Sequence, residues 1–102
     1  MDILERIKEL VSRGRVTFTK KARFEMTVDD LTPELVSEAI VNAPIVNKTL
    51  RSKNPQTGVA EKLYVIKGVT DGGIFIYTKG KIDKLKDKEV FYVLISSKRS
   101  TD

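Results

Sequence analysis

The spacing of apolar residues changes at Pro44, and this change limits the folds that the chain can adopt. Before Pro44, apolar residues recur at the spacing of amphipathic helices. After it, four segments rich in Val, Ile, Tyr, Phe and Thr are typical of strands, at residues 45–50, 61–70, 74–82 and 89–97. The pattern predicts an α+β fold in which helices pack on one face of a four- to five-stranded antiparallel sheet.

The N-terminal part predicts a helix followed by a short strand. A helix over residues 3–12 is indicated by apolar residues at helical spacing, namely Ile3, Leu4, Ile7, Leu10 and Val11. Gly14 is expected to end this helix. Residues 15–19 then alternate polar and apolar side chains, which suits a strand.

Two further helices are predicted before Pro44. The first covers residues 20–26, with the Thr19 hydroxyl at its start. The second covers residues 33–42, where Thr32 is a favourable N-cap and Pro33 occupies the first helical position, at which its missing N–H costs nothing.

Two connections between the strands have recognisable sequences. Asp71-Gly72 is the dipeptide that type I′ hairpin turns prefer, because both central residues of that turn need a positive φ. Residues 83–88, DKLKDK, are expected to form a charged loop.

Composition excludes several classes of chemistry. The chain has no Cys and no His, so disulfides, thiolate nucleophiles, zinc sites and imidazole bases are absent. No apolar run approaches the roughly 18 residues of a membrane span, and the charged amphipathic start is unlike a signal peptide, so we expect a cytoplasmic protein without membrane contacts. The length of 102 residues fits one domain over residues 1–102, with an N-terminal helix in 1–14 and the core in 15–99.

Positive charge is concentrated in the second half of the chain. Residues 1–45 carry 7 Lys and Arg against 8 Asp and Glu, whereas residues 46–102 carry 12 against 6. This asymmetry favours polyanionic partners, above all RNA or DNA, although a merely solvated surplus of lysines is the alternative.

Three basic clusters are candidates for a phosphate-binding site, and surface solvation is the alternative for each. They are Lys20, Lys21 and Arg23 at a strand-to-helix junction; Lys67, Tyr77, Lys79 and Lys81 on the two central strands; and Lys98 with Arg99 after the last strand. The tyrosines Tyr64, Tyr77 and Tyr92 fall on the last three strands, where they could stack on bases or lie half-buried in the core. Glu34 and Glu38 lie four residues apart on a predicted helix and are read as solvent-facing carboxylates rather than metal ligands.

Five segments in order resemble the RelE-like toxin superfamily: VTFTKKARFEM, DLTPELVSEAIVNAP, LYVIKGV, IFIYTK and VFYVLISSKRS, within residues 15–99. The resemblance is closest to small members whose helix begins with the pattern T-x-H-A-x-x-x-M. Thr19, Ala22 and Met26 match this pattern, and Lys21 replaces the histidine.

The resemblance implies helices packed on a twisted antiparallel sheet. It also implies an endoribonuclease that cuts messenger RNA, often in the ribosome, and that an antitoxin silences. Sites in this superfamily are typically basic residues with a tyrosine, on the open sheet face and near the C-terminus. On matching positions the resemblance implicates Lys67, Tyr77, Lys79, Lys98 and Arg99 as catalytic residues.

These observations lead to the hypothesis of a metal-independent, cofactor-free RNA endonuclease of a toxin-antitoxin system. Lys67 and Lys79 would hold phosphates, Tyr77 would stack on or orient a base, and Lys98 with Arg99 would stabilise the transition state. The expected RNA-binding residues are Lys20, Lys21, Arg23, Tyr64, Lys81 and Tyr92. The expected partners are RNA, on the ribosome or free, and an acidic antitoxin. The alternative is a non-catalytic module that binds RNA or an acidic protein through the same basic sheet face.

Overall fold

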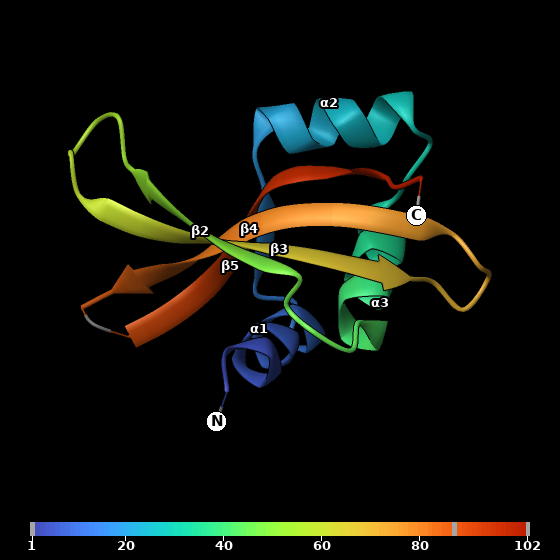
Figure 1. Cartoon of the computed structure of the whole chain (residues 1–102), viewed down its shortest axis with the longest axis horizontal. Coiled ribbons are helices and arrows are strands. Elements are labelled where there is room, and N and C mark those ends of the chain that lie inside the picture. The colour runs from blue at the N-terminus through green and yellow to red at the C-terminus, as the bar shows by residue number, and fades with distance from the viewer. Residues whose placement is uncertain (1, 87, 102) are drawn as a thin grey trace.

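Three helices and a five-stranded sheet form from residues 2–86 and 88–101, the part of the chain that the computed structural model describes (Figure 1). In chain order the elements are α1 (Ile3–Ser12), β1 (Val16–Phe18), α2 (Lys20–Val28), α3 (Pro33–Asn42), β2 (Lys48–Lys53), β3 (Ala60–Val69), β4 (Phe75–Leu85) and β5 (Lys88–Arg99). The α+β class is therefore confirmed. None of the helices in these described ranges has the length and apolar character needed to cross a membrane.

The sheet is mixed, with the strand order β1-β5-β4-β3-β2. Strands β2 to β5 form the expected antiparallel meander, each paired with the next along the chain. The expectation of a wholly antiparallel sheet is wrong, because β1 runs parallel to β5 with Val16 opposite Tyr92 and Phe18 opposite Leu94. A strand of three residues carries too little pattern to indicate its partner or its direction.

The β3–β4 turn forms where expected but differs in type. Gly73 N donates to Thr70 O, and Gly73 has a positive φ, whereas Asp71 and Gly72 do not. Ile74 N also donates to Thr70 Oγ1 at 3.0 Å. The type I′ prediction is therefore wrong: the second glycine allows a type I turn followed by a left-handed residue, which is the usual three-residue hairpin loop.

Most of the segment predicted as a charged loop belongs to a hairpin instead. β4 continues to Leu85 and β5 begins at Lys88, with Lys84 opposite Glu89 and Leu85 opposite Lys88. Asp87 lies outside the described residues. Charged residues are compatible with strands here because this end of the hairpin projects beyond the helices, with most of its side chains exposed to solvent.

Local sequence signals place the helix ends well. α1 and α3 have the expected bounds, and the hydroxyls of Thr19 and Thr32 accept hydrogen bonds from Ala22 N and Leu35 N at the starts of α2 and α3. α2 ends two residues later than expected, where Asp30 adopts a positive φ.

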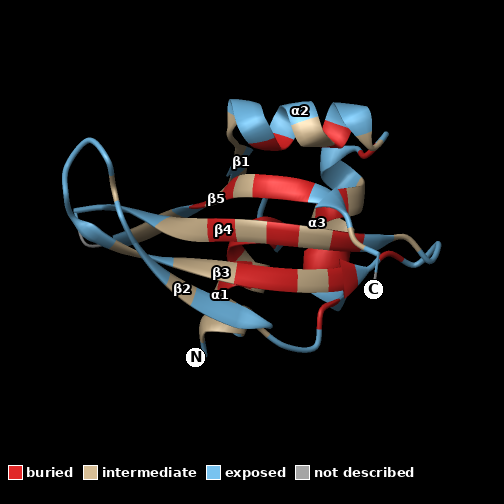
Figure 2. Ribbon diagram, turned by 45° about the horizontal axis from the view of Figure 1, so that its top comes forward, coloured by how far each residue is buried: buried red, intermediate tan, exposed pale blue. Residues whose placement is uncertain are grey.

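The helices occupy two positions around the sheet. α1 and α3 pack on one face, and Figure 2 shows the strands passing in front of them. Their apolar side chains form the core with buried residues of β3, β4 and β5: Ile7, Leu10, Val36, Ala39, Ile40, Ile66, Ile76, Tyr92 and Leu94. α2 instead lies along the edge of β5, beyond the point where β1 ends (Figure 2).

Candidate nucleic-acid site on the open sheet face

We call the face of the sheet opposite α1 and α3 the open face, because no helix among the described residues packs on it. Successive side chains of a strand point to opposite faces. Ile66 and Ile76 lie in the core, so their neighbours Lys67 and Tyr77 belong to the open face. This alternation explains how strands with buried residues also present lysines to solvent.

Three of the predicted site residues form one row across the open face. Lys67 on β3 is opposite Tyr77 on β4, and Tyr77 is opposite Lys98 on β5. The Nζ atom of Lys98 lies 5.4 Å from the centroid of the Tyr77 ring, a cation–π distance. We call Lys67, Tyr77 and Lys98 the cross-strand row.

Lys79 adds a third cation beside this row. It lies two residues from Tyr77 on β4, hence on the same face, between Val65 and Ser96 on the neighbouring strands. No ion pair involves Lys67, Lys79 or Lys98 within residues 2–86 and 88–101. Three ammonium groups without carboxylate partners on one sheet face make a surface that attracts anions.

Hydrogen bonds to Asn47 hold the backbone at Lys67, where the pairing of β3 with β2 has stopped. The β2–β3 ladder begins at Lys48 and Val65, so β3 beyond this pair has no strand neighbour on that side. Asn47 supplies hydrogen bonds in place of a paired strand. Its Oδ1 accepts a hydrogen bond from Lys67 N at 2.8 Å, and its own N donates to Val65 O at 2.8 Å. The side chain of Asn47 thus continues the edge and keeps the strand in register.

Exposed apolar side chains border the cross-strand row. Phe24 and Val28 of α2 are 71% and 66% exposed, and a hollow of about 220 Å³ is lined by both together with Lys98. Along the strands, two residues from Tyr77 and Lys67, Phe75 on β4 is 50% exposed and Val69 lies opposite it on β3. The combination of lysines with aromatic and apolar surface matches the requirements of a single-stranded nucleic acid, which offers phosphates and bases.

Other predicted residues lie away from the row. Arg99 follows Lys98 and so points to the opposite side; its N donates to Asp29 Oδ2 at 2.7 Å and its Nε to Asp29 O at 2.9 Å. Lys81 is on the open face, but its Nζ binds Glu61 Oε2 at 2.7 Å. Arg99 therefore anchors the end of α2, and Lys81 is already neutralised.

The two remaining tyrosines lie on the core side of the sheet. Tyr92 is 0% exposed, and its ring lies against Gly80, where a Cβ atom would be 2.6 Å from Cζ. The expectation that Tyr92 stacks on RNA is therefore wrong, since the ring has no accessible face. Tyr64 is half-buried beside a different cavity.

The basic residues of α2 divide between two sides of the helix. Lys20 and Lys21 are exposed and precede Phe24 by four and three residues, which places them on its side of α2. Lys21 forms an ion pair with Glu25 at 3.5 Å. Arg23 turns away, and its Nε donates to Phe18 O at 3.3 Å. Lys20 thus extends the positive surface toward the α2 side, whereas Lys21 is paired with Glu25 and Arg23 points away.

Glu25 and Asp29 are important side chains that sequence reasoning missed. Glu25 Oε1 accepts hydrogen bonds from Ser96 Oγ at 2.8 Å and Ser97 N at 3.1 Å. Partial burial raises the pKa of Glu25, but the hydrogen bonds from Ser96 and Ser97 and the charge of Lys21 outweigh it, so the pKa lies below its ordinary value. A four-residue spacing of carboxylates on α2 was the available signal.

Of the two acidic residues of α3, Glu34 is exposed and Glu38 has a structural role. Glu38 Oε1 accepts a hydrogen bond from Asp71 N at 2.7 Å, which ties α3 to the β3–β4 turn. Within the described ranges, no three Asp or Glu side chains gather closely enough to hold a metal ion.

Comparison with protein-family models, curated protein sequences and solved structures found no match to this chain.

Proposed function

We propose that the open face binds single-stranded RNA and that the protein is a metal-independent RNA endonuclease of the RelE-like toxin type, acting in the cytoplasm. The observation that carries this proposal is the cross-strand row of Lys67, Tyr77 and Lys98, with Lys79 beside it and no carboxylate paired with these lysines in the described ranges. Phosphates bind the lysines, and a base stacks on the ring of Tyr77.

The chemistry requires little beyond position and charge. The ribose 2′-oxygen bonds to the adjacent phosphorus while the bond from phosphorus to the 5′-oxygen breaks. The 2′-hydroxyl loses its proton to solvent water, and the leaving 5′-oxygen takes a proton from solvent water. Lys67, Lys79 and Lys98 stabilise the negative charge of the pentacoordinate intermediate, and binding across the row aligns the attacking and leaving oxygens.

The test is RNA cleavage by the purified chain, with and without ribosomes. Products should carry 2′,3′-cyclic or 3′-phosphate ends, and EDTA should leave the rate unchanged because ammonium groups supply the charge. Lys67→Ala and Lys98→Ala should each lower the rate by about 10²-fold, as loss of one oxyanion donor does. Lys53→Ala, an exposed lysine at the end of β2, is the matched control. RNA that binds but stays intact in both settings would exclude the enzyme.

A non-catalytic binding module is the second candidate function. It is favoured because the nearby carboxylates are already bound to other groups. Glu25 is bound to Ser96 and Ser97, and Glu61 is bound to Lys81, so neither is free to act as a general base. In this case the open face holds RNA or an acidic protein such as an antitoxin without cutting. Competition between RNA and an acidic partner for Lys67 and Lys98 is then the expected behaviour.

A further inference from the structure

A second cavity lies where the sheet divides into two hairpins. The β3–β4 ladder ends at Tyr64 and Gly80, but β3 remains paired with β2 as far as Ala60, and β4 with β5 as far as Leu85. The hairpins therefore diverge, as Figure 1 shows. Register shifts in β4–β5 between Lys79 and Gly80 and between Asp83 and Lys84 fit this change of direction, because β-bulges increase the local twist. The space between the hairpins is a cavity of about 410 Å³, which we call the hairpin cleft.

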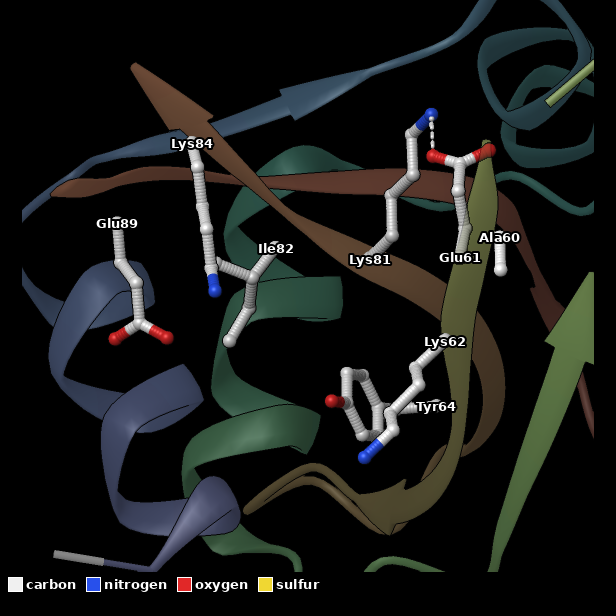
Figure 3. Close-up of a pocket in the computed structure, with 8 residues that line it drawn as sticks. All are labelled: Ala60, Glu61, Lys62, Tyr64, Lys81, Ile82, Lys84 and Glu89. Carbon is white, nitrogen blue, oxygen red and sulfur yellow. Dashed lines mark hydrogen bonds and ion pairs between the residues drawn. The ribbon is translucent and has the colours of Figure 1, made fainter. Parts of the chain in front are cut away.

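An aromatic ring and apolar side chains form part of the wall of the hairpin cleft. The half-buried ring of Tyr64 stands in the cleft, with Ile82 across from it (Figure 3). Burial, and after it the charge of Glu89, raises the pKa of Tyr64, so its phenol stays protonated at neutral pH and can donate a hydrogen bond. A flat ligand group can therefore stack against this ring or bind its hydroxyl.

The charges around the hairpin cleft leave a positive surplus. Its two carboxylates are engaged: Glu61 binds Lys81 at 2.7 Å, and Glu89 binds Arg6 of α1. Lys62 and Lys84 also line the cleft, and neither forms an ion pair within residues 2–86 and 88–101. In Figure 3 the Nζ atom of Lys62 ends beside the ring of Tyr64, and the Nζ atom of Lys84 ends beside Ile82. Two unpaired ammonium groups in a cleft with an aromatic ring suit a ligand that combines an anion with a planar group.

We propose that the hairpin cleft binds one nucleotide, with the base against Tyr64 and the phosphate bound by the lysines of its wall, Lys62 beside the ring and Lys84 beside Ile82. Its volume lies within the roughly 300–1,000 Å³ range of small-molecule sites. The cleft is distinct from the cross-strand row, because Tyr64 belongs to the core side of β3 and Lys67 to the open face. The nucleotide is either free or part of an RNA strand that extends from the open face, and these two sources share the same chemistry.

The experiment is a titration of the full chain, followed by ¹H–¹⁵N NMR spectra. The probes are AMP and UMP, with adenosine and inorganic phosphate alone as partial ligands, and a hexaribonucleotide as the strand. Binding should shift amide signals of residues 60–64 and 81–84. Each partial ligand should bind more weakly than AMP, because it makes only one of the two contacts.

Substitutions locate the contacts. Lys62→Ala/Lys84→Ala should weaken nucleotide binding by about tenfold or more, since it removes two charge-assisted contacts. Tyr64→Leu should lower the affinity for the nucleotide by a similar factor, whereas Tyr64→Phe should keep the stacking and most of the affinity. The control Arg13→Ala/Lys53→Ala removes two exposed cations that do not line the cleft. The native spectrum of each variant verifies folding.

The outcomes separate the two sources and the two sites. Loss of AMP affinity in the lysine double variant with unchanged hexanucleotide affinity supports a free nucleotide; loss of hexanucleotide affinity supports a nucleotide within a strand. Unchanged affinity for both probes, or shifts confined to the surroundings of Lys67, Tyr77 and Lys98, overturns the proposal. Because Lys67→Ala tests the open face alone, failure of the hairpin cleft is distinguishable from failure of RNA binding there.

Discussion

Tyr92 and Gly80 depend on each other for their positions. The Tyr92 ring fills the space that a side chain at residue 80 would occupy, and it is fully buried among core residues. Its hydroxyl has no hydrogen-bond partner in the described residues, and burial raises the pKa of the phenol. Tyr92 is thus a packing residue despite its polar end.

Gly80→Ala should therefore destabilise the fold. The new Cβ would lie 2.6 Å from Tyr92 Cζ, and the fully enclosed ring cannot move away without disturbing the core. Overpacking of this kind costs about 1–3 kcal/mol in free energy of unfolding, measurable by urea denaturation. Gly72→Ala is the control, because its Cβ would be 3.9 Å from the nearest atom. Equal midpoints for both variants would contradict this packing argument.

At the scale of elements, α2 protects an edge of the sheet. β1 covers only part of β5, so the N–H groups of Ser97 and Arg99 lie beyond its reach. Glu25 and Asp29 accept hydrogen bonds from these two groups at 3.1 and 2.7 Å. Carboxylates one helical turn apart therefore take the place of a neighbouring strand for these two N–H groups and make them unavailable to the edge of another chain.

Acid should weaken this helix-to-strand attachment. The pKa of Glu25 is lower in the folded chain than its ordinary value of 4.5. Its stabilising contribution is therefore complete above about pH 4.5 and is lost as the pH falls through the lower folded value. Glu25→Gln should lower the free energy of unfolding by about 1–3 kcal/mol at pH 7, as expected for hydrogen bonds to a charged group.

The difference between Glu25→Gln and the native protein should shrink as the pH falls below 4.5, when followed by denaturation at several pH values. Asp83→Asn, which removes a carboxylate charge at an exposed position, is the control. A constant difference between pH 7 and pH 3 would mean that packing, rather than the carboxylate charge, explains the loss.

At the scale of the whole molecule, folding separates charge from core. The strands that follow Pro44 contribute apolar residues to the face under α1 and α3 and lysines to the open face. The surplus of positive charge in the second half of the sequence thus becomes, in part, a surface property of one side of the protein. RNA binding on that side should depend strongly on ionic strength, because each neutralised phosphate releases counterions.

The affinity for single-stranded RNA should fall with salt at a log–log slope of about −0.7 per phosphate contacted. Lys67→Ala, Lys79→Ala and Lys98→Ala should each make the slope shallower by about 0.7, as measured by fluorescence anisotropy at several salt concentrations. Lys53→Ala should leave it unchanged. Binding that does not respond to salt would rule out an electrostatic site on the open face.

Local signals in the sequence were sufficient for the presence of the three helices and for the antiparallel order of β2 to β5. α1, α3 and their N-caps depend on contacts between residues only three or four positions apart, so the local sequence is enough to predict them. The alternation around Ile66 and Ile76 also predicts that Lys67 and Tyr77 share a face once both segments are known to be strands. The positive charge of the strands was also predictable, because it follows from the number of Lys and Arg residues in these segments.

Tertiary structure alone decided the parallel pairing of β1, the burial of Tyr92, the attachment of Arg99 to Asp29 and the hairpin cleft. Each of these depends on residues far apart in the chain that meet only after the strands have taken their register. Turn geometry and β-bulges set that register, and a shift of one residue would turn every side chain to the other face. Sequence periodicity therefore determined which residues could face solvent or core, while packing chose their neighbours.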